Sequence, residues 1–86
     1  MSYRVVIKPS AFKELEALPK SIIKRLDRMI RELGENPRPV GSKKLRGWDL
    51  YRISRGYYRI IYKINQSLKE IEVVKIGHRK EVYRRF

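Results

Sequence analysis

The chain has 86 residues and a formal net charge of +13 at pH 7, with 22 lysines and arginines against 9 aspartates and glutamates. This length predicts one small domain, residues 1–86, and a hydrophobic fraction of 42% is enough for a packed core. The absence of cysteine excludes disulfides and thiolate metal sites, and a single histidine argues against a zinc site, so we expect no metal and no cofactor. With no apolar signal region and no stretch of membrane-spanning length, we expect a soluble cytoplasmic protein that does not bind membranes.

The positive charge is concentrated in the second part of the chain. Residues 1–37 carry 8 basic and 5 acidic side chains, whereas residues 38–86 carry 14 basic and 4 acidic ones. Such asymmetry predicts a polyanionic partner, because each phosphate contact releases counterions. A solvated surface rich in ion pairs would instead need acidic residues in step with the basic ones, and these are missing. An acidic protein partner fits the charge equally well.

The first elements are a strand and a short helix. Residues 3–8 have the β-branched content of a strand, which Pro9 is expected to end. Ser10 is then in place to cap a helix that runs to about Leu18, and Pro19 breaks that helix.

The second helix is the clearest element of the sequence. It is expected to begin near Lys20 or Ser21, and Gly34 supplies a C-terminal stop. The short link predicts that the two helices pack antiparallel as a helical hairpin. The apolar face recurs at spacings of three and four residues and consists of Ile22, Leu26, Met29, Ile30 and Leu33.

A basic loop and a β-hairpin follow. Residues 35–47 are punctuated by proline and glycine, which predicts a loop. Residues 48–64 contain two runs rich in Tyr and Ile, joined across Arg55 and Gly56, and a glycine at such a tight link favours a hairpin. Trp48, Tyr51, Tyr58 and Tyr62 are expected in the core or at its edge, whereas Tyr57 fits a core position and a nucleobase contact equally well.

The last strand is expected over residues 69–76 and is ended by Gly77. Its apolar residues alternate either around Ile71 and Val73 or around Val74 and Ile76, so both faces carry apolar groups and the strand is expected to be central. The tail from His78 is short and basic. The order β-α-α-β-β-β predicts an α+β fold: a small, twisted, mostly antiparallel sheet with the helical hairpin packed on one face.

Arginines interrupt the apolar pattern of the hairpin. Arg52 shares a strand face with Ser54, and Arg59 lies on the partner strand. If the last strand pairs with the hairpin, Arg79 is expected at the edge of the sheet, within reach of Arg52 and Arg59. Converging guanidiniums need an anion between them, and arginine binds phosphate in a bidentate manner. Tyr83 adds an aromatic surface for an unstacked base, which favours single-stranded RNA over duplex DNA.

Proton transfer is less well provided for. His78 is the only imidazole, with a reference pKa of about 6.5 that suits acid–base catalysis, and Glu81 and Tyr83 are weaker candidates. A lone histidine beside a glycine is more often a solvated turn residue, however, and a serine such as Ser54 is more often a locally bonded hydroxyl than a nucleophile.

Three segments together closely resemble the RelE/ParE superfamily of toxin–antitoxin systems, and the RelE branch fits best. They are LPKSIIKRLDRMIREL, KKLRGWDLYRISRGYYRIIYKI and VVKIGHRKEVYRR. The resemblance implies a microbial-ribonuclease-like fold and a ribosome-dependent endoribonuclease (an mRNA interferase). Such a toxin enters the A site of a 70S-type ribosome and cuts the mRNA by 2′-hydroxyl attack, which inhibits translation. It also implies a cognate RelB-like antitoxin, which neutralises the toxin and with it binds their own operator DNA.

The resemblance also assigns roles to individual residues. It implies that Arg52 binds the phosphate, Arg59 stabilises the transition state, Arg79 helps to protonate the leaving 5′-oxygen and Tyr83 stacks on the nucleotide. Ser54 stands where the family carries a lysine proposed as general base, so the base is open among Ser54, Arg55 and His78. Further RNA contacts are expected from Lys43, Lys44, Arg46 and Lys80.

Two other functions fit the same sequence. One is the ParE-like branch, in which this fold inhibits DNA gyrase without catalysis. The other is a catalytically degenerate relative that only binds RNA, for which we expect steep salt dependence and no cleavage product.

Overall fold

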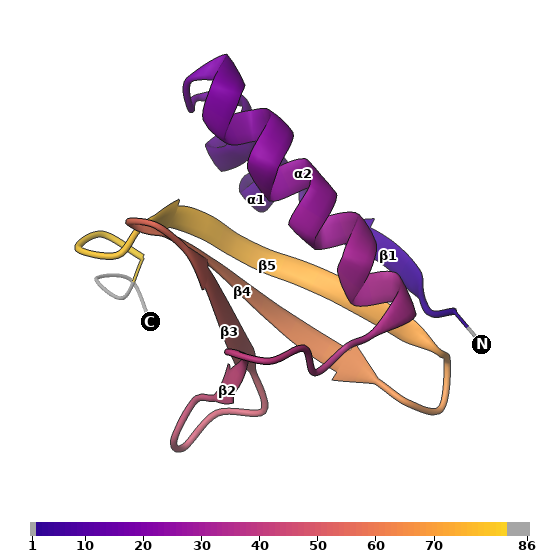
Figure 1. The fold of residues 1–86 in the computed structure, drawn as a ribbon. Coiled ribbons are helices and arrows are strands. Elements are labelled where there is room, and N and C mark those ends of the chain that lie inside the picture. Colours follow the sequence, from indigo (N-terminus) through magenta and orange to yellow (C-terminus); the bar gives the residue numbers. More distant parts are fainter. Residues whose placement is uncertain (1, 83–86) are drawn as a thin grey trace.

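A five-stranded sheet carries both helices on one of its faces (Figure 1). The computed structural model describes residues 2–82 of the chain. The elements, in chain order, are β1 (Arg4–Ile7), α1 (Pro9–Glu16), α2 (Lys20–Glu35), β2 (Lys43–Lys44), β3 (Tyr51–Arg55), β4 (Tyr58–Asn65) and β5 (Glu70–His78).

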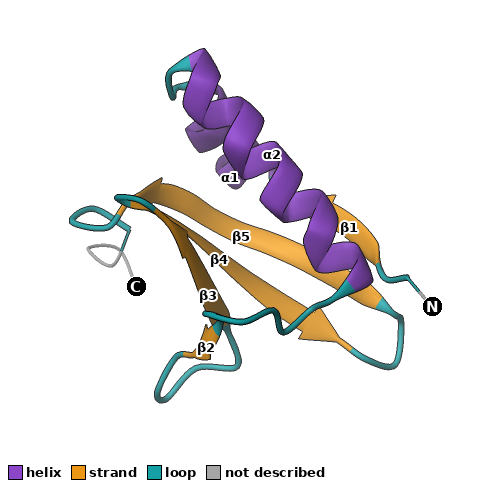
Figure 2. Cartoon of the chain, viewed as in Figure 1, coloured by secondary structure: helices purple, strands orange, loops and turns teal. Residues whose placement is uncertain are grey.

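The strand order is β1-β5-β4-β3-β2, and only β1 and β5 run parallel (Figure 2). This arrangement confirms the expected α+β fold and the central position of the last strand. Neither helix of residues 2–82 is long and apolar enough to cross a membrane.

Helix α1 begins two residues earlier than the expected Ser10 cap implies. Pro9 is its first residue, Lys8 occupies the N-cap position, and no side chain caps the helix, so the expected Ser10 cap was wrong. Proline is favoured at the first helical position because its φ is already helical and its missing N–H would have no partner there.

Helix α2 does not end at Gly34, contrary to expectation, but continues to Glu35. The backbone N–H of Tyr3 donates to the Gly34 carbonyl at 2.6 Å, and a Cβ at residue 34 would lie 3.0 Å from the Tyr3 carbonyl oxygen. Gly34 therefore permits close contact between α2 and β1 and is not a helix stop.

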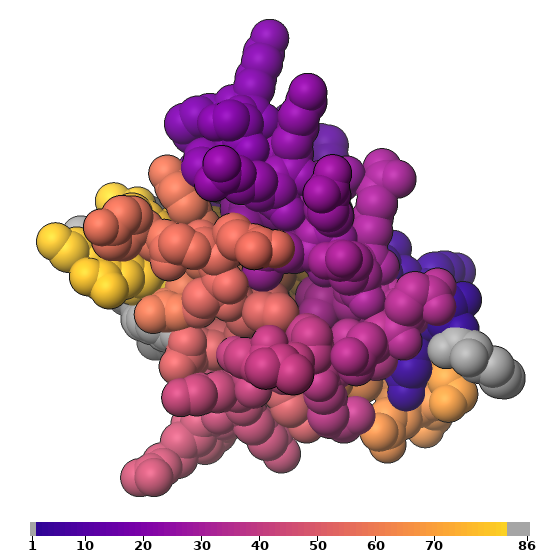
Figure 3. Space-filling view, viewed as in Figure 1, coloured from indigo at the N-terminus to yellow at the C-terminus, as the bar shows by residue number. Residues whose placement is uncertain are grey.

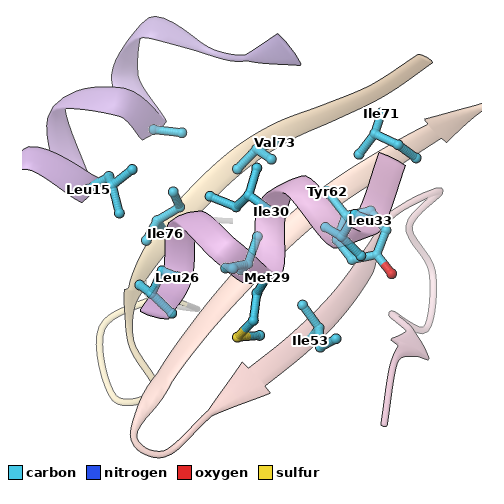
Figure 4. Close-up of a cluster of buried hydrophobic side chains, with 12 residues drawn as sticks. Leu15, Leu26, Met29, Ile30, Leu33, Ile53, Tyr62, Ile71, Val73 and Ile76 are labelled. Atoms are coloured by element: carbon cyan, nitrogen blue, oxygen red, sulfur yellow. The ribbon is translucent and has the colours of Figure 1, made fainter. Parts of the chain in front are cut away.

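The core lies between α2 and the sheet (Figure 4). Leu26, Met29, Ile30 and Leu33 of α2 are all at most 5% exposed, which confirms the apolar face predicted from spacing. The sheet contributes Ile53, Ile60, Tyr62, Ile71, Val73 and Ile76.

A β-bulge in β5 explains how both predicted alternations of that strand are used. Ile61 pairs with Lys75 and Tyr62 with Val73, which leaves Val74 as the extra residue. The extra residue reverses the alternation, so that Ile71, Val73 and Ile76 all face the helices. The strand then continues through Gly77 to His78, so the expected end at Gly77 was wrong.

The loop of residues 35–47 contains a strand that the sequence did not predict. Lys43 and Lys44 form β2 by pairing with Arg52 and Tyr51 of β3. Lysine has little intrinsic strand preference, so this pairing is imposed by the available edge of β3.

The aromatic residues follow the expected core placement with one exception. Tyr62 is fully buried, its ring stacks on Tyr51 with centroids 5.9 Å apart, and Tyr58 also packs against the core. Trp48, by contrast, is 50% exposed, so its expected core position was wrong. It lies in the loop between β2 and β3, which projects from the body of the molecule (Figure 3).

Candidate active site

Arg52, Ser54 and Arg59 lie on the sheet face turned away from the helices. Arg52 and Ser54 alternate along β3 with Ile53, which packs into the core on the helix side. Arg59 is the direct partner of Ser54 across the β3–β4 pair, so the three side chains share one face. The structure thus brings together these three of the residues singled out from the sequence.

Two guanidinium groups converge on one hydroxyl at this site. Nη1 of Arg52 donates to Oγ of Ser54 at 3.3 Å, and Nη1 of Arg59 donates to the same oxygen. Both bonds are partly buried, and the buried Nε of Arg59 has no hydrogen-bond partner among residues 2–82. A half-buried guanidinium with an unused donor is suited to binding an anion, because a phosphate oxygen would satisfy the donor and offset the charge.

Gly77 leaves open space beside Arg59. The two residues are partners across the β4–β5 pair, and a Cβ built on Gly77 would meet no atom within 4 Å. Its position opposite Arg59 depends on the bulge at Val74, which sets the alternation of this part of β5.

Arg79 follows β5 directly, at the tip of the β3–β4 hairpin. Its backbone N–H donates to the Tyr57 carbonyl at 2.7 Å, which extends the β4–β5 ladder beyond the strands. Its guanidinium is exposed and lies 5.4 Å from the centre of the Tyr57 ring. Arg79 is therefore two residues beyond Gly77, the partner of Arg59.

His78 lies away from the arginine pair. It is the partner of Tyr58, with the two rings edge to face at 5.9 Å. Its Nδ1 accepts a hydrogen bond from the Lys80 backbone N–H at 3.2 Å, so the lone pair that would act as a base is already used. The residue lines a groove of about 620 Å³ together with Glu14 of α1 and Leu18 of the link that follows it, beside β5.

Arg55 also faces away from Ser54. It pairs with Tyr58 and lines a concavity of about 320 Å³ on the helix side together with three basic residues of α2, Lys24, Arg25 and Arg28.

The expected RNA-contacting lysines and arginine are spread around the arginine face. Lys43 is the partner of Arg52 and so shares its face, whereas Lys44 pairs with Tyr51 on the other side. Arg46 and Lys80 are exposed in the segments that follow β2 and β5. Tyr83 lies outside the described residues. Among residues 2–82, no group of three or more His, Asp or Glu side chains is placed to hold a metal ion.

Sequence reasoning missed two features of this site. Ser54 accepts hydrogen bonds from two arginines because it is the strand partner of Arg59, and this pairing cannot be read from the spacing of residues in the sequence. The open space at Gly77 depends on the bulge, although a glycine inside a strand pattern is itself a signal of a bulge or of a close approach.

Comparison with known proteins places the chain among small bacterial and archaeal toxins. The family model for the ParE toxin of the type II toxin–antitoxin system, parDE, matches residues 5–83. Toxin RelE of Mycobacterium tuberculosis is 32% identical over 85 residues, an alignment that covers 95% of this chain and 87% of that protein.

Solved structures give the same result for the fold. The archaeal RelE–RelB complex from Pyrococcus horikoshii matches with a TM-score of 0.83 and 36% identity over 94% of this chain and 99% of that chain. A variant of the E. coli toxin RelE in the free state, with two arginines replaced by alanine, matches with a TM-score of 0.80 and 30% identity. This second match covers 96% of this chain and 92% of that chain.

Proposed function

The chain belongs to the ParE toxin family of type II toxin–antitoxin systems, in its RelE branch, and we propose that it is a ribosome-dependent endoribonuclease that cleaves mRNA in the A site. One observation carries the proposal. Arg52 and Arg59 converge on Ser54 on the sheet face opposite the helices, with a buried Arg59 nitrogen that has no hydrogen-bond partner among the described residues. A nucleic-acid phosphate supplies the missing acceptor.

In the proposed reaction, the scissile phosphate binds between Arg52 and Arg59. The 2′-oxygen forms a bond to phosphorus and loses its proton, the bond to the 5′-oxygen breaks, and that oxygen gains a proton. The products are a 2′,3′-cyclic phosphate and a 5′-hydroxyl. The two guanidiniums stabilise the added negative charge of the phosphorane, a kind of contribution worth about 10²–10³ in rate for a single donor.

The remaining roles follow the family pattern. Arg79 is exposed at the sheet end, where it can approach the leaving 5′-oxygen, and we assign Tyr83 to stacking on the nucleotide. Ser54 is unsuited to the role of base because its oxygen already accepts two guanidinium hydrogen bonds. We propose that a group of the ribosome accepts the 2′-hydroxyl proton and that the ribosome orients the hydroxyl for in-line attack.

A RelB-like antitoxin is the proposed protein partner. The archaeal relative was solved as a RelE–RelB complex, and the charge of +13 on this chain favours an acidic segment that competes with RNA for the arginine face. The toxin–antitoxin pair is proposed to bind its own operator DNA.

The test is in vitro translation with purified ribosomes, followed by primer extension to map breaks in the mRNA. The wild type is expected to cut within the A-site codon only when ribosomes are present, and Arg79→Ala is expected to lose most of this cleavage. Lys13→Ala removes the same charge from an exposed position on α1 and should cut normally. Intact mRNA with the wild type would overturn the proposal.

Inhibition of DNA gyrase is the alternative function, since the matching family model is described as the ParE toxin. The same fold would then act through protein contacts without cleavage. A supercoiling assay with purified gyrase separates the two functions: inhibition that survives Arg59→Ala, together with intact mRNA, would support the gyrase target.

A further inference from the structure

Tyr57 is an aromatic side chain at the hairpin tip that the core does not use. It occupies the second position of the two-residue turn between β3 and β4, after Gly56 with its φ of +61°. It is 63% exposed, whereas Tyr51, Tyr58 and Tyr62 all pack into or against the core. Its ring therefore presents apolar surface to solvent without contributing to the core.

Three contacts fix Tyr57 at the hairpin tip, and one of them is with a cation. The His78 ring stacks on it with centroids 5.8 Å apart and an interplanar angle of 14°. The Arg79 guanidinium lies 5.4 Å from its ring centre, and the Arg79 backbone N–H donates to its carbonyl at 2.7 Å. A flat ring fixed beside a cation is the arrangement on which single-stranded bases stack.

Tyr57 lies close to the proposed phosphate site in the chain and through its contact with Arg79. It lies in the turn directly before β4, two residues before Arg59 in the chain. Arg59 is assigned above to the scissile phosphate and Arg79 to its leaving 5′-oxygen, and the Arg79 guanidinium lies beside the Tyr57 ring. A nucleotide whose phosphate is bound by these arginines would have a neighbouring base within reach of the Tyr57 ring.

We propose that Tyr57 is a stacking platform for one unpaired nucleobase next to the scissile phosphate, in contact with Arg79. The proposal rests on the proposed function. Because every base has a π-face, the platform accepts any base, and the contact adds affinity and positions the strand.

The test measures binding of a short single-stranded RNA with 2′-O-methyl riboses, which cannot be cleaved, to the full chain. Tyr57→Ala and Tyr57→Leu are expected to weaken binding about ten- to a hundred-fold, in line with the loss of one stacked base. Tyr57→Phe keeps the ring and should bind like the wild type. Phe12→Ala removes an aromatic ring that is 48% exposed on α1 and should have no effect.

An abasic scan of the same RNA locates the contact. Replacing one base by an abasic site should weaken binding to the wild type and to Tyr57→Phe, yet leave binding to Tyr57→Ala unchanged. The dependence of log K on log salt should keep its slope in Tyr57→Ala, because no phosphate contact is removed.

Equal binding by the wild type and Tyr57→Ala, or equal sensitivity of both to every abasic site, would overturn the proposal. A Tyr57→Ala variant that loses only antitoxin binding would also overturn it, because the ring would then be a protein contact. These measurements use neither ribosomes nor cleavage, so they are distinguishable from a failure of the proposed nuclease activity, which is read from primer extension.

Discussion

Ser54 and Arg59 are direct partners across the β3–β4 pair, and the Ser54 hydroxyl oxygen accepts hydrogen bonds from both Arg59 and Arg52. A hydroxyl has two acceptor lone pairs and one donor, so both lone pairs are used and only the O–H remains free to donate. This arrangement makes Ser54 a positioning residue for the two guanidiniums, with its hydrogen available to a bound phosphate oxygen.

Ser54→Ala is therefore expected to lower cleavage by about ten- to a hundred-fold, the equivalent of losing about 1.5–3 kcal/mol of charge-assisted hydrogen bonding. Ser54→Thr keeps the hydroxyl and should retain most activity. The measurement is the rate of A-site cleavage across a pH range for each variant. A positioning role leaves the shape of the pH profile unchanged, whereas loss of the rise in rate with pH in Ser54→Ala would show that Ser54 is the general base.

We expect Arg59 to be required for cleavage and to lower the stability of the fold. Its half-buried guanidinium has an unsatisfied Nε and lies close to the like charge of Arg52, whose guanidinium bonds the same hydroxyl. An unsatisfied buried donor costs about 1–3 kcal/mol, so Arg59→Met is expected to unfold at a melting temperature equal to or a few degrees above that of the wild type. Cleavage should be lost. A clear fall in the melting temperature would mean that the guanidinium is a structural group whose partners are satisfied.

The sequence predicted those parts of the fold that are set by local periodicity. The face of α2 from Leu26 to Leu33 follows from spacing because a helix repeats its environment every three to four residues. The hairpin around Gly56 follows from the need for a positive φ in a tight turn.

The features that the sequence did not give depend on pairing between distant residues. Lys43 and Lys44 form a strand only because they pair with the edge of β3. A glycine is needed at position 34 because the backbone of Tyr3, near the N-terminus, packs closely against it. The bulge at Val74 is likewise a property of two strands. The site shows the same division: Arg52 and Arg59 were predictable from alternation, whereas the contacts of Arg55 and His78 were set by tertiary packing.

Gly77 provides a steric test of the site that leaves the charges unchanged. A side chain at this position meets no protein atom near its Cβ, and no positive φ is required there, so Gly77→Ala and Gly77→Leu are both expected to fold. The added atoms would occupy the space beside Arg59 that we assign to the RNA backbone. We expect cleavage to fall progressively from glycine to alanine to leucine, with melting temperatures equal to or above that of the wild type. Full activity of Gly77→Leu would show that the RNA does not pass this point.

Tyr62 links the core to alkaline stability. Its hydroxyl donates to the Pro37 carbonyl at 2.6 Å, and burial raises its pKa above the ordinary value of 10.0, although a hydrogen bond with Ser42 acts in the opposite direction. In the unfolded chain this tyrosine ionises from about pH 10, while the folded chain still holds the proton. The unfolded state thus binds fewer protons, and the free energy of unfolding falls as the pH rises above about 10.

Tyr62→Phe removes both the hydrogen bond and the ionisable group. At pH 7 the variant should be less stable by about 1 kcal/mol, because the Pro37 carbonyl loses its partner. Above pH 10 its stability should fall less steeply than that of the wild type, so the two urea-unfolding free energies should converge. Tyr57→Phe makes the same chemical change on an exposed ring and should match the wild type at neutral pH. A constant difference in unfolding free energy between Tyr62→Phe and the wild type at every pH would contradict this prediction. It would mean that the pKa of Tyr62 is the same in the folded and the unfolded chain, so that burial does not raise it.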